Sequence, residues 1–280
     1  MTYVLAKLIK PPKFDAIKYE RYLKKRLGLC IKTLSSSLKG FFASNKIPNY
    51  RADDYVDDLD QLLKDIAAFM SSNDYTLIKD LFEYGNLILG TTSKQLKNSL
   101  KGILSVSVSS PSLALNKFSS PLLDKNIDLM LKSWVSTNTK LIKSIESNLL
   151  EQVGVIIESG YRSGVSATTL SQQIKSRFNV SQSRSRLIAR DQTSKLHSNY
   201  IEYEHKQLNI KEYIWSTSDD ERVRTSHKVL NQKVCQWSDP LTYRDKVGDK
   251  LKHKSSIGGV PLQCGIDFQC RCGIIAVIEL

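Results

Sequence analysis

Hydrophobic residues recur at helical spacing through the first part of the chain. Apolar positions three and four residues apart predict an amphipathic helix over 14–41, which Pro48 ends. A second apolar stripe predicts a helix over 59–70, and the aspartates before it are typical of a helix N-terminus, where the dipole favours carboxylates. Asp74 then caps a third helix that continues to Ile88.

A Ser- and Val-rich seam at 102–121 interrupts this pattern and indicates a loop or hinge. Valine alternates with serine inside the seam, so a short β-hairpin is the alternative. Helical periodicity then returns over 122–160. Two further helices follow, one capped by Ser166 and a longer one that is capped by Ser181 and ends at Asn209.

The periodicity changes after Lys211. Apolar and β-branched residues predict strands at 212–216 and 233–237, with a short helix at 223–230 between them. Residues 241–266 are rich in Lys, Gly and Ser, which indicates a mobile loop. An apolar run at 273–280 predicts a terminal strand.

Together these elements predict an α+β fold that is mostly helical, with an elongated N-terminal region followed by a small C-terminal α+β module. We expect three parts: a helical N-terminal region at 1–120, a helical stalk at 121–210 and the α+β module at 211–280. The sequence contains no run of about 18 apolar residues, so no membrane span is predicted. The start of the chain lacks the apolar core and cleavage site of a secretory signal.

Positive charge is concentrated near the N-terminus. Of a net charge of +13, residues 1–50 hold 11 Lys and Arg against 2 Asp and Glu. A basic amphipathic helix can lie on DNA, on an acidic protein or on a membrane surface, whereas the simplest alternative is a solvated helix face. The candidate DNA- or partner-binding residues on this face are Lys18, Arg21, Lys24, Lys25 and Arg26.

Four of the five cysteines lie after residue 234, close to a histidine and several arginines. An odd number of clustered cysteines is a poor disulfide framework in a chain of this size, and it favours a reducing compartment. Chemically rich residues fall into five blocks, in this order: Ser185-Arg186-Leu187-Ile188-Ala189-Arg190-Asp191-Gln192-Thr193, Tyr213-Ile214-Trp215, Asp220-Glu221-Arg222-Val223-Arg224-Thr225-Ser226-His227, Lys233-Val234 with Trp237-Ser238-Asp239-Pro240, and Asp267-Phe268-Gln269-Cys270-Arg271-Cys272.

In the identity and order of these blocks, residues 125–280 resemble the Mu-F-type minor head proteins of tailed bacteriophages, also called phage head morphogenesis proteins. Two positions depart from the family pattern: Thr225 replaces a proline before Ser226-His227, and Cys264-Gly265 stands where Pro-Gly is usual. The motif residues carried over are Arg190, Asp191, Trp215, Asp220, Arg222, Arg224, His227, Cys270, Arg271 and Cys272.

The resemblance implies a minor capsid protein, present in few copies per virion, with no enzymatic activity. It implies action in procapsid and head assembly, a place at the portal or capsid interior, and a role in genome packaging or DNA ejection. The implied partners are the portal protein, the major capsid or scaffolding protein and double-stranded DNA. The implied location is the virion, and the host cytoplasm during assembly. Related modules also occur fused to toxin domains, so an effector or toxin-like enzyme is the alternative.

The histidine and cysteines of the last blocks allow several chemistries. His227, Cys270 and Cys272, with Cys264 or Cys235, form a candidate set of four zinc ligands. We favour the alternative in which the cysteines pack as small buried hydrophobes, His227 and the arginines form crosslinks, and no cofactor is bound. A Cys–His nucleophile and base pair would need a third, orienting group. Arg222 and Arg224 beside the acids 219–221 are typical of a salt-bridged turn.

Overall fold

A computed structural model describes residues 2–44, 52–72, 74–101, 103, 124–163 and 165–279. The predicted break at Pro48 lies outside the described residues, as does the predicted seam at 102–121 except for residue 103. Within the described part of the chain, no helix combines the length and apolarity needed to cross a membrane.

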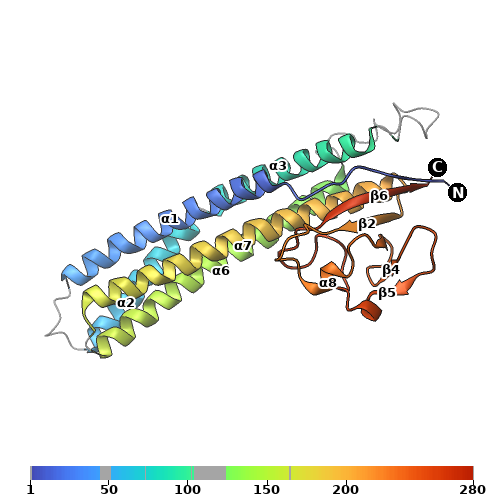
Figure 1. The fold of residues 1–280 in the computed structure, drawn as a ribbon. Helices are drawn as coiled ribbons and strands as arrows, with labels where there is room; N and C mark the ends of the chain where they lie inside the picture. Colours follow the sequence, from blue (N-terminus) through green and yellow to red (C-terminus); the bar gives the residue numbers. More distant parts are fainter. Residues whose placement is uncertain are drawn as a thin grey trace. The chain divides into compact units, whose positions relative to one another are not determined.

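Long helices make up most of the described chain, as the apolar periodicity predicts. They are α1 (Lys13–Ser44), α2 (Ala52–Ser71), α3 (Asp74–Leu100), α6 (Lys125–Arg162) and α7 (Ala167–Gln207), and each is labelled in Figure 1. Together with the C-terminal sheet described below, they confirm the predicted α+β class with a mostly helical chain.

The helix α7 is continuous where the sequence predicts two helices. Asn179 and Ser181, interpreted as an end and a new N-cap, both lie inside it. Ser181 is buried, and its carbonyl accepts a hydrogen bond from the Ser185 hydroxyl at 3.1 Å. The predicted boundary is wrong because polar side chains that can cap a helix can also bond to the helix backbone one turn away.

In the described part of the chain, six antiparallel strands form one sheet in the order β1-β6-β2-β3-β4-β5. Their bounds are β1 (Tyr3–Leu5), β2 (Glu212–Ser216), β3 (Val234–Gln236), β4 (Thr242–Arg244), β5 (Lys252–His253) and β6 (Gly273–Glu279), and the short helix α8 spans Thr225–Lys228. The strand β6 pairs with both β1 and β2, so the two ends of the chain lie side by side (Figure 1). The sequence did not predict β1.

The stretch 241–266 is not the mobile loop that its composition indicated. It contains β4, β5 and a 3₁₀ helix at Lys254–Ile257, and Tyr243, Lys254 and Cys264 are buried. The Lys254 ammonium donates a hydrogen bond to the Leu262 carbonyl at 2.9 Å. Polar composition was misleading because the fold buries these groups with hydrogen-bond partners, as buried polar groups require.

The chain divides into two compact units, each assembled from separate stretches. The first unit comprises Met1–Ala16, Glu83–Trp134 and Arg190–Leu280, and the second comprises Ile17–Phe82 and Val135–Ala189. The predicted three-part division instead follows chain order, and it stays a prediction.

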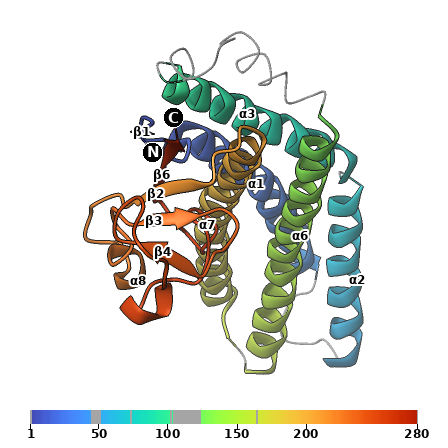
Figure 2. The ribbon, with the colours of Figure 1, turned by 90° about the vertical axis from the view of Figure 1, so that its right-hand side faces the viewer.

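The first unit has a core formed by the sheet and two helices. Tyr213, Trp215 and Trp237 cluster with Ile274 of β6 and Ile201 of α7, and the C-terminal end of α3 joins them. Figure 2 shows the strands β2, β3 and β4 next to the C-terminal part of α7. This arrangement places the loop before β6 close to α7.

The second unit is helical and is crosslinked by polar side chains. The buried Tyr19 hydroxyl donates to the Asn138 side chain at 2.7 Å. Arg26 pairs with Glu146 at 2.9 Å, and both side chains are largely buried. Such pairs connect α1 to α6 inside this unit.

Candidate functional site

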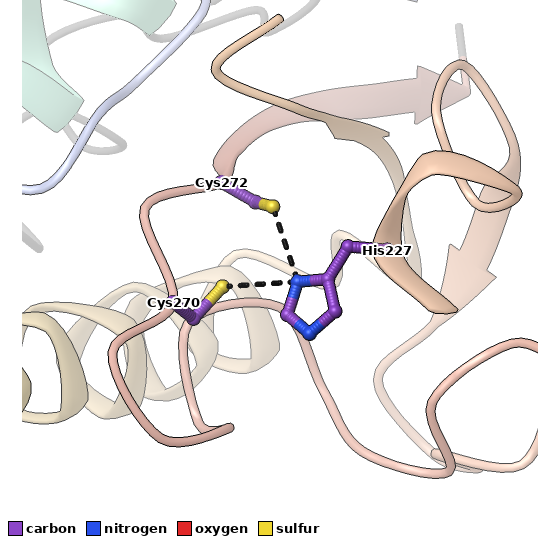
Figure 3. A group of neighbouring side chains, drawn as sticks. All are labelled: His227, Cys270 and Cys272. Atoms are coloured by element: carbon purple, nitrogen blue, oxygen red, sulfur yellow. Dashed lines mark hydrogen bonds between the residues drawn. The ribbon is translucent and has the colours of Figure 1, made fainter. Parts of the chain in front are cut away.

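The structure brings together three of the predicted zinc ligands. His227 is carried by α8, while Cys270 and Cys272 lie just before β6. The His227 Nδ1 atom lies 3.4 Å from the Cys272 Sγ and 3.7 Å from the Cys270 Sγ, and both thiols point toward the ring (Figure 3). One ligand atom from each residue falls within 4.8 Å of the other two.

The other two candidate ligands differ in position. Cys264 is fully buried, its thiol interacts with the thiols of Cys270 and Cys272, and it lies 3.4 Å from the Gly273 carbonyl oxygen. Cys235 instead lies against Tyr213 and Lys254. Of these two, the structure places Cys264 at the cluster.

A carboxylate that the sequence analysis did not single out lies on the far side of the imidazole. The Oδ2 atom of Asp267 is 2.8 Å from the His227 Nε2 and 3.0 Å from the Arg224 guanidinium. Asp267 begins the last motif block, three positions before Cys270, but spacing alone gave no reason to pair it with His227.

The groups of this cluster shift one another's protonation. Burial by itself would lower the pKa of His227, but the thiols of Cys270 and Cys272 and the Asp267 carboxylate raise that pKa to about 10. Interactions with the thiols of Cys264 and Cys272, and then with His227, lower the pKa of Cys270 despite its burial. The arrangement therefore favours a thiolate beside an imidazolium.

The helix α7 holds the loop that carries these side chains. The buried Asp191 carboxylate accepts the backbone N–H of Gln269 at 2.9 Å, and the Ser194 hydroxyl donates to the Cys270 carbonyl at 3.0 Å. One turn further along, the Ser198 hydroxyl donates to the Cys264 carbonyl. Asp191 and these two serines thus contribute to the site by fixing the backbone on both sides of Asp267.

The cluster and the α7 residues that hold its loop lie within residues 151–275, which match the model of the family described as Phage Mu protein F like protein. This part of the chain is similar to the Mu-F family. The first 150 residues lie outside the match.

A curated relative matches about half of the chain. The chain is 32% identical over 154 residues to an uncharacterized protein of Haemophilus influenzae strain Rd, which covers 55% of this chain. The matched region makes up 31% of the relative, so this chain spans less than a third of that protein's length. No solved structure gives a significant match.

The arginines of the Mu-F blocks divide into two groups. Arg271 forms a two-pronged ion pair with Asp220, at 2.6 and 2.7 Å, and Arg224 reaches both Asp267 and the Phe268 carbonyl. Arg190 and Arg222 are exposed. Arg222 and Arg224 were predicted to form the ion pairs of the acidic turn, but Asp220 pairs with Arg271 and Arg224 pairs with Asp267, outside the turn.

Trp215, another Mu-F block residue, packs against the imidazole ring of the cluster. Its ring is fully buried and meets the His227 ring edge-on, with the ring centroids 5.4 Å apart. The Lys254 ammonium lies 5.2 Å from the centroid of the indole ring. The His227 ring is thus positioned by the Trp215 ring, by the Asp267 carboxylate at Nε2 and by the Cys272 thiol at Nδ1.

The predicted basic face of α1 lies outside the Mu-F match and is smaller than expected. Lys18, Arg21 and Lys25 are exposed. Lys24 forms an ion pair with Glu20 at 2.8 Å, and Arg26 turns inward to Glu146. Arg26 is not part of a free binding face because its guanidinium is already paired and largely buried.

Proposed function

We propose that this chain is a minor head protein of a tailed bacteriophage that acts in procapsid and head assembly. The observation that carries the proposal is the match of residues 151–275 to the Mu-F family. In this proposal the protein associates with the portal or the capsid interior and influences DNA packaging or ejection. Its partners are the portal protein and the major capsid or scaffolding protein.

The use of the motif side chains supports a structural rather than a catalytic role. His227 is 2% exposed and Cys270 and Cys272 are each 4% exposed, so a substrate would not reach them without a rearrangement. Asp191, Ser194 and Arg224 hold backbone atoms of the same loop. These contacts act as crosslinks within the first unit.

One observation keeps an enzymatic alternative in view. Cys272, His227 and Asp267 lie in the order of a nucleophile, a base and an orienting group. If the chain is an effector enzyme, His227→Ala abolishes an activity and leaves the fold intact. If the role is structural, the same change lowers the melting temperature and removes no activity.

Quantitative mass spectrometry of gradient-purified procapsids and virions from the source phage tests the proposed function. A few copies per particle in both preparations would support it. Presence in procapsids alone would indicate a transient assembly factor. Absence from both would contradict a role in the head and favour the effector alternative.

A further inference from the structure

We propose that His227, Cys264, Cys270 and Cys272 bind one structural Zn²⁺ ion. This site goes beyond the proposed role in head assembly, since it concerns what stabilises the first unit whichever partner that unit meets. The inference rests on ligand type, ligand spacing, burial and the partner of the outer histidine nitrogen.

The spacing of the three central ligand atoms fits a tetrahedral ion. With Zn–S bonds of about 2.3 Å and Zn–N bonds of about 2.0–2.1 Å, nitrogen and sulfur ligands lie about 3.5 Å apart at the tetrahedral angle. The two distances from the His227 Nδ1 to the thiols are 3.4 and 3.7 Å, one on each side of that value. Figure 3 shows both thiols directed at this nitrogen.

Cys264 is the fourth ligand of the proposal. Its buried thiol interacts with the thiols of both Cys270 and Cys272, so its sulfur lies beside the two thiols that face His227. Three thiolates with one imidazole make a common donor set of structural zinc sites. The thiol of Cys235 lies against Lys254 and Tyr213 and takes no part.

The outer nitrogen of His227 has the partner that metal-bound histidines usually have. Its Nε2 lies 2.8 Å from the Asp267 carboxylate, which leaves Nδ1 to face the sulfurs. A carboxylate in this position fixes the ring orientation and raises the basicity of the ligand nitrogen. Ser194 and Ser198 in turn fix the backbone carbonyls of Cys270 and Cys264.

Burial makes the site structural rather than catalytic. All four side chains are 4% exposed or less. A catalytic zinc keeps a coordination position open to substrate, whereas a structural zinc is closed by four protein ligands. The strands β3, β4 and β5 of the same unit have only 3, 3 and 2 residues, so a metal crosslink would add stability to a unit whose strand pairing is short.

The test is metal analysis of the full chain, purified under reducing conditions and desalted after incubation with Zn²⁺. We expect one zinc per chain by mass spectrometry of the metal, and loss of most of it in Cys272→Ser and in Cys264→Ser. Cys235→Ser is the matched control, because it replaces a buried cysteine of the same unit outside the cluster, and it should retain the zinc. Zinc retained in full by Cys264→Ser would overturn the assignment of the fourth ligand.

X-ray absorption at the zinc edge gives a second readout on the wild-type chain, which does not depend on any variant folding. The expected environment is three sulfurs at about 2.3 Å and one nitrogen at about 2.0 Å. A shell of nitrogen and oxygen alone, or no stoichiometric zinc in the wild type, would overturn the proposal. Neither result would affect the head-assembly role, which is measured on particles.

Discussion

At the scale of single residues, Gly265 shows how closely the cysteine-bearing loop approaches α7. Its φ of +86° is in the left-handed region, and a Cβ there would lie 2.7 Å from the Cβ of Ser198. Gly248 has a similar φ of +88° but nothing within 4 Å of a built Cβ. Comparing substitutions at the two glycines therefore distinguishes the cost of a side chain at positive φ, which both share, from the cost of a close contact, which applies to Gly265.

We expect Gly265→Ala to destabilise the protein by about 1–3 kcal/mol more than Gly248→Ala, since overpacking a tight contact costs about that much. Both variants share the cost of a side chain at positive φ. Urea denaturation followed by circular dichroism measures the difference. Equal destabilisation of the two variants would mean that the loop can move away from α7 at little cost.

Asp267 and Asp220 are both ion-paired aspartates, but they differ in burial. Asp267 contacts His227, whose side chain is only 3% exposed, whereas the side chains of Arg271 and Asp220 are 44% and 39% exposed. We predict that Asp267→Ala lowers the free energy of unfolding by about 1.5–3 kcal/mol, as expected for a buried hydrogen bond to a charged group. Asp220→Ala should cost clearly less, because exposed ion pairs contribute little.

Thermal and urea unfolding of the two aspartate variants, side by side with the wild type, provides the measurement. A destabilisation in Asp220→Ala as large as that in Asp267→Ala would show that burial does not set the strength of these crosslinks.

The sequence predicted which residues form the cluster better than it predicted which residues bond to them. The sequence indicated that His227, Cys270 and Cys272 belong together, and the structure places them in one cluster. It did not indicate Asp267, Ser194 or Ser198, because a hydrogen bond between α7 and a loop about 70 residues later leaves no periodic pattern. The sequence also did not indicate that Lys254 is buried, because lysine is almost never fully buried. The polar composition of residues 241–266, which contain Lys254, instead suggested an exposed loop.

At the scale of elements, α7 carries two buried histidines in the first unit. The His197 Nδ1 lies 3.0 Å from the Thr92 hydroxyl, and the His205 Nδ1 accepts a hydrogen bond from the Trp237 indole at 3.1 Å. Burial lowers the pKa of each histidine to about 3, from an ordinary value of 6.5. Both are therefore neutral in the folded protein at about pH 5.

The free energy of unfolding should fall as the pH drops below about 6.5. In this range His197 and His205 bind protons in the unfolded chain, whereas in the folded chain they stay neutral down to about pH 3. Each histidine contributes up to about 1.4 kcal/mol per pH unit across this window. Urea denaturation at about pH 7.5 and about pH 5 measures the slope. His197→Gln should reduce it, whereas His253→Gln, at an exposed site, should not; equal slopes in all three proteins would contradict the argument.

The elements differ in how well the sequence predicted them. Long amphipathic helices such as α1 and α6 follow from the spacing of apolar residues. The strand β1 could not be predicted, because three residues gain their conformation only by pairing with β6 at the other end of the chain. The same holds for β4 and β5, whose pairing depends on neighbouring strands rather than on their own composition.

At the scale of the whole molecule, the net charge of +13 is concentrated in the first 50 residues, and we propose a polyanionic partner for this charge. The structure reduces the candidate contact residues to Lys18, Arg21 and Lys25, which are exposed on α1. They are spaced by three and four residues, so they lie along one face of the helix. This is the geometry with which a helix can follow a phosphate backbone.

If this face binds DNA, the affinity of the wild-type chain for duplex DNA should fall steeply with salt concentration, because phosphate contacts release counterions. Reversing the charge of Lys18, Arg21 and Lys25 to Glu should lower the slope of log affinity against log salt by about 1 for each phosphate-binding side chain replaced. Reversing three exposed charges on α6 and α7, Lys140, Lys175 and Arg177, is the matched control. Fluorescence anisotropy at several salt concentrations measures the slopes. Equal slopes in the two triple variants, or binding that does not change with salt, would instead assign this face to a protein partner such as the portal.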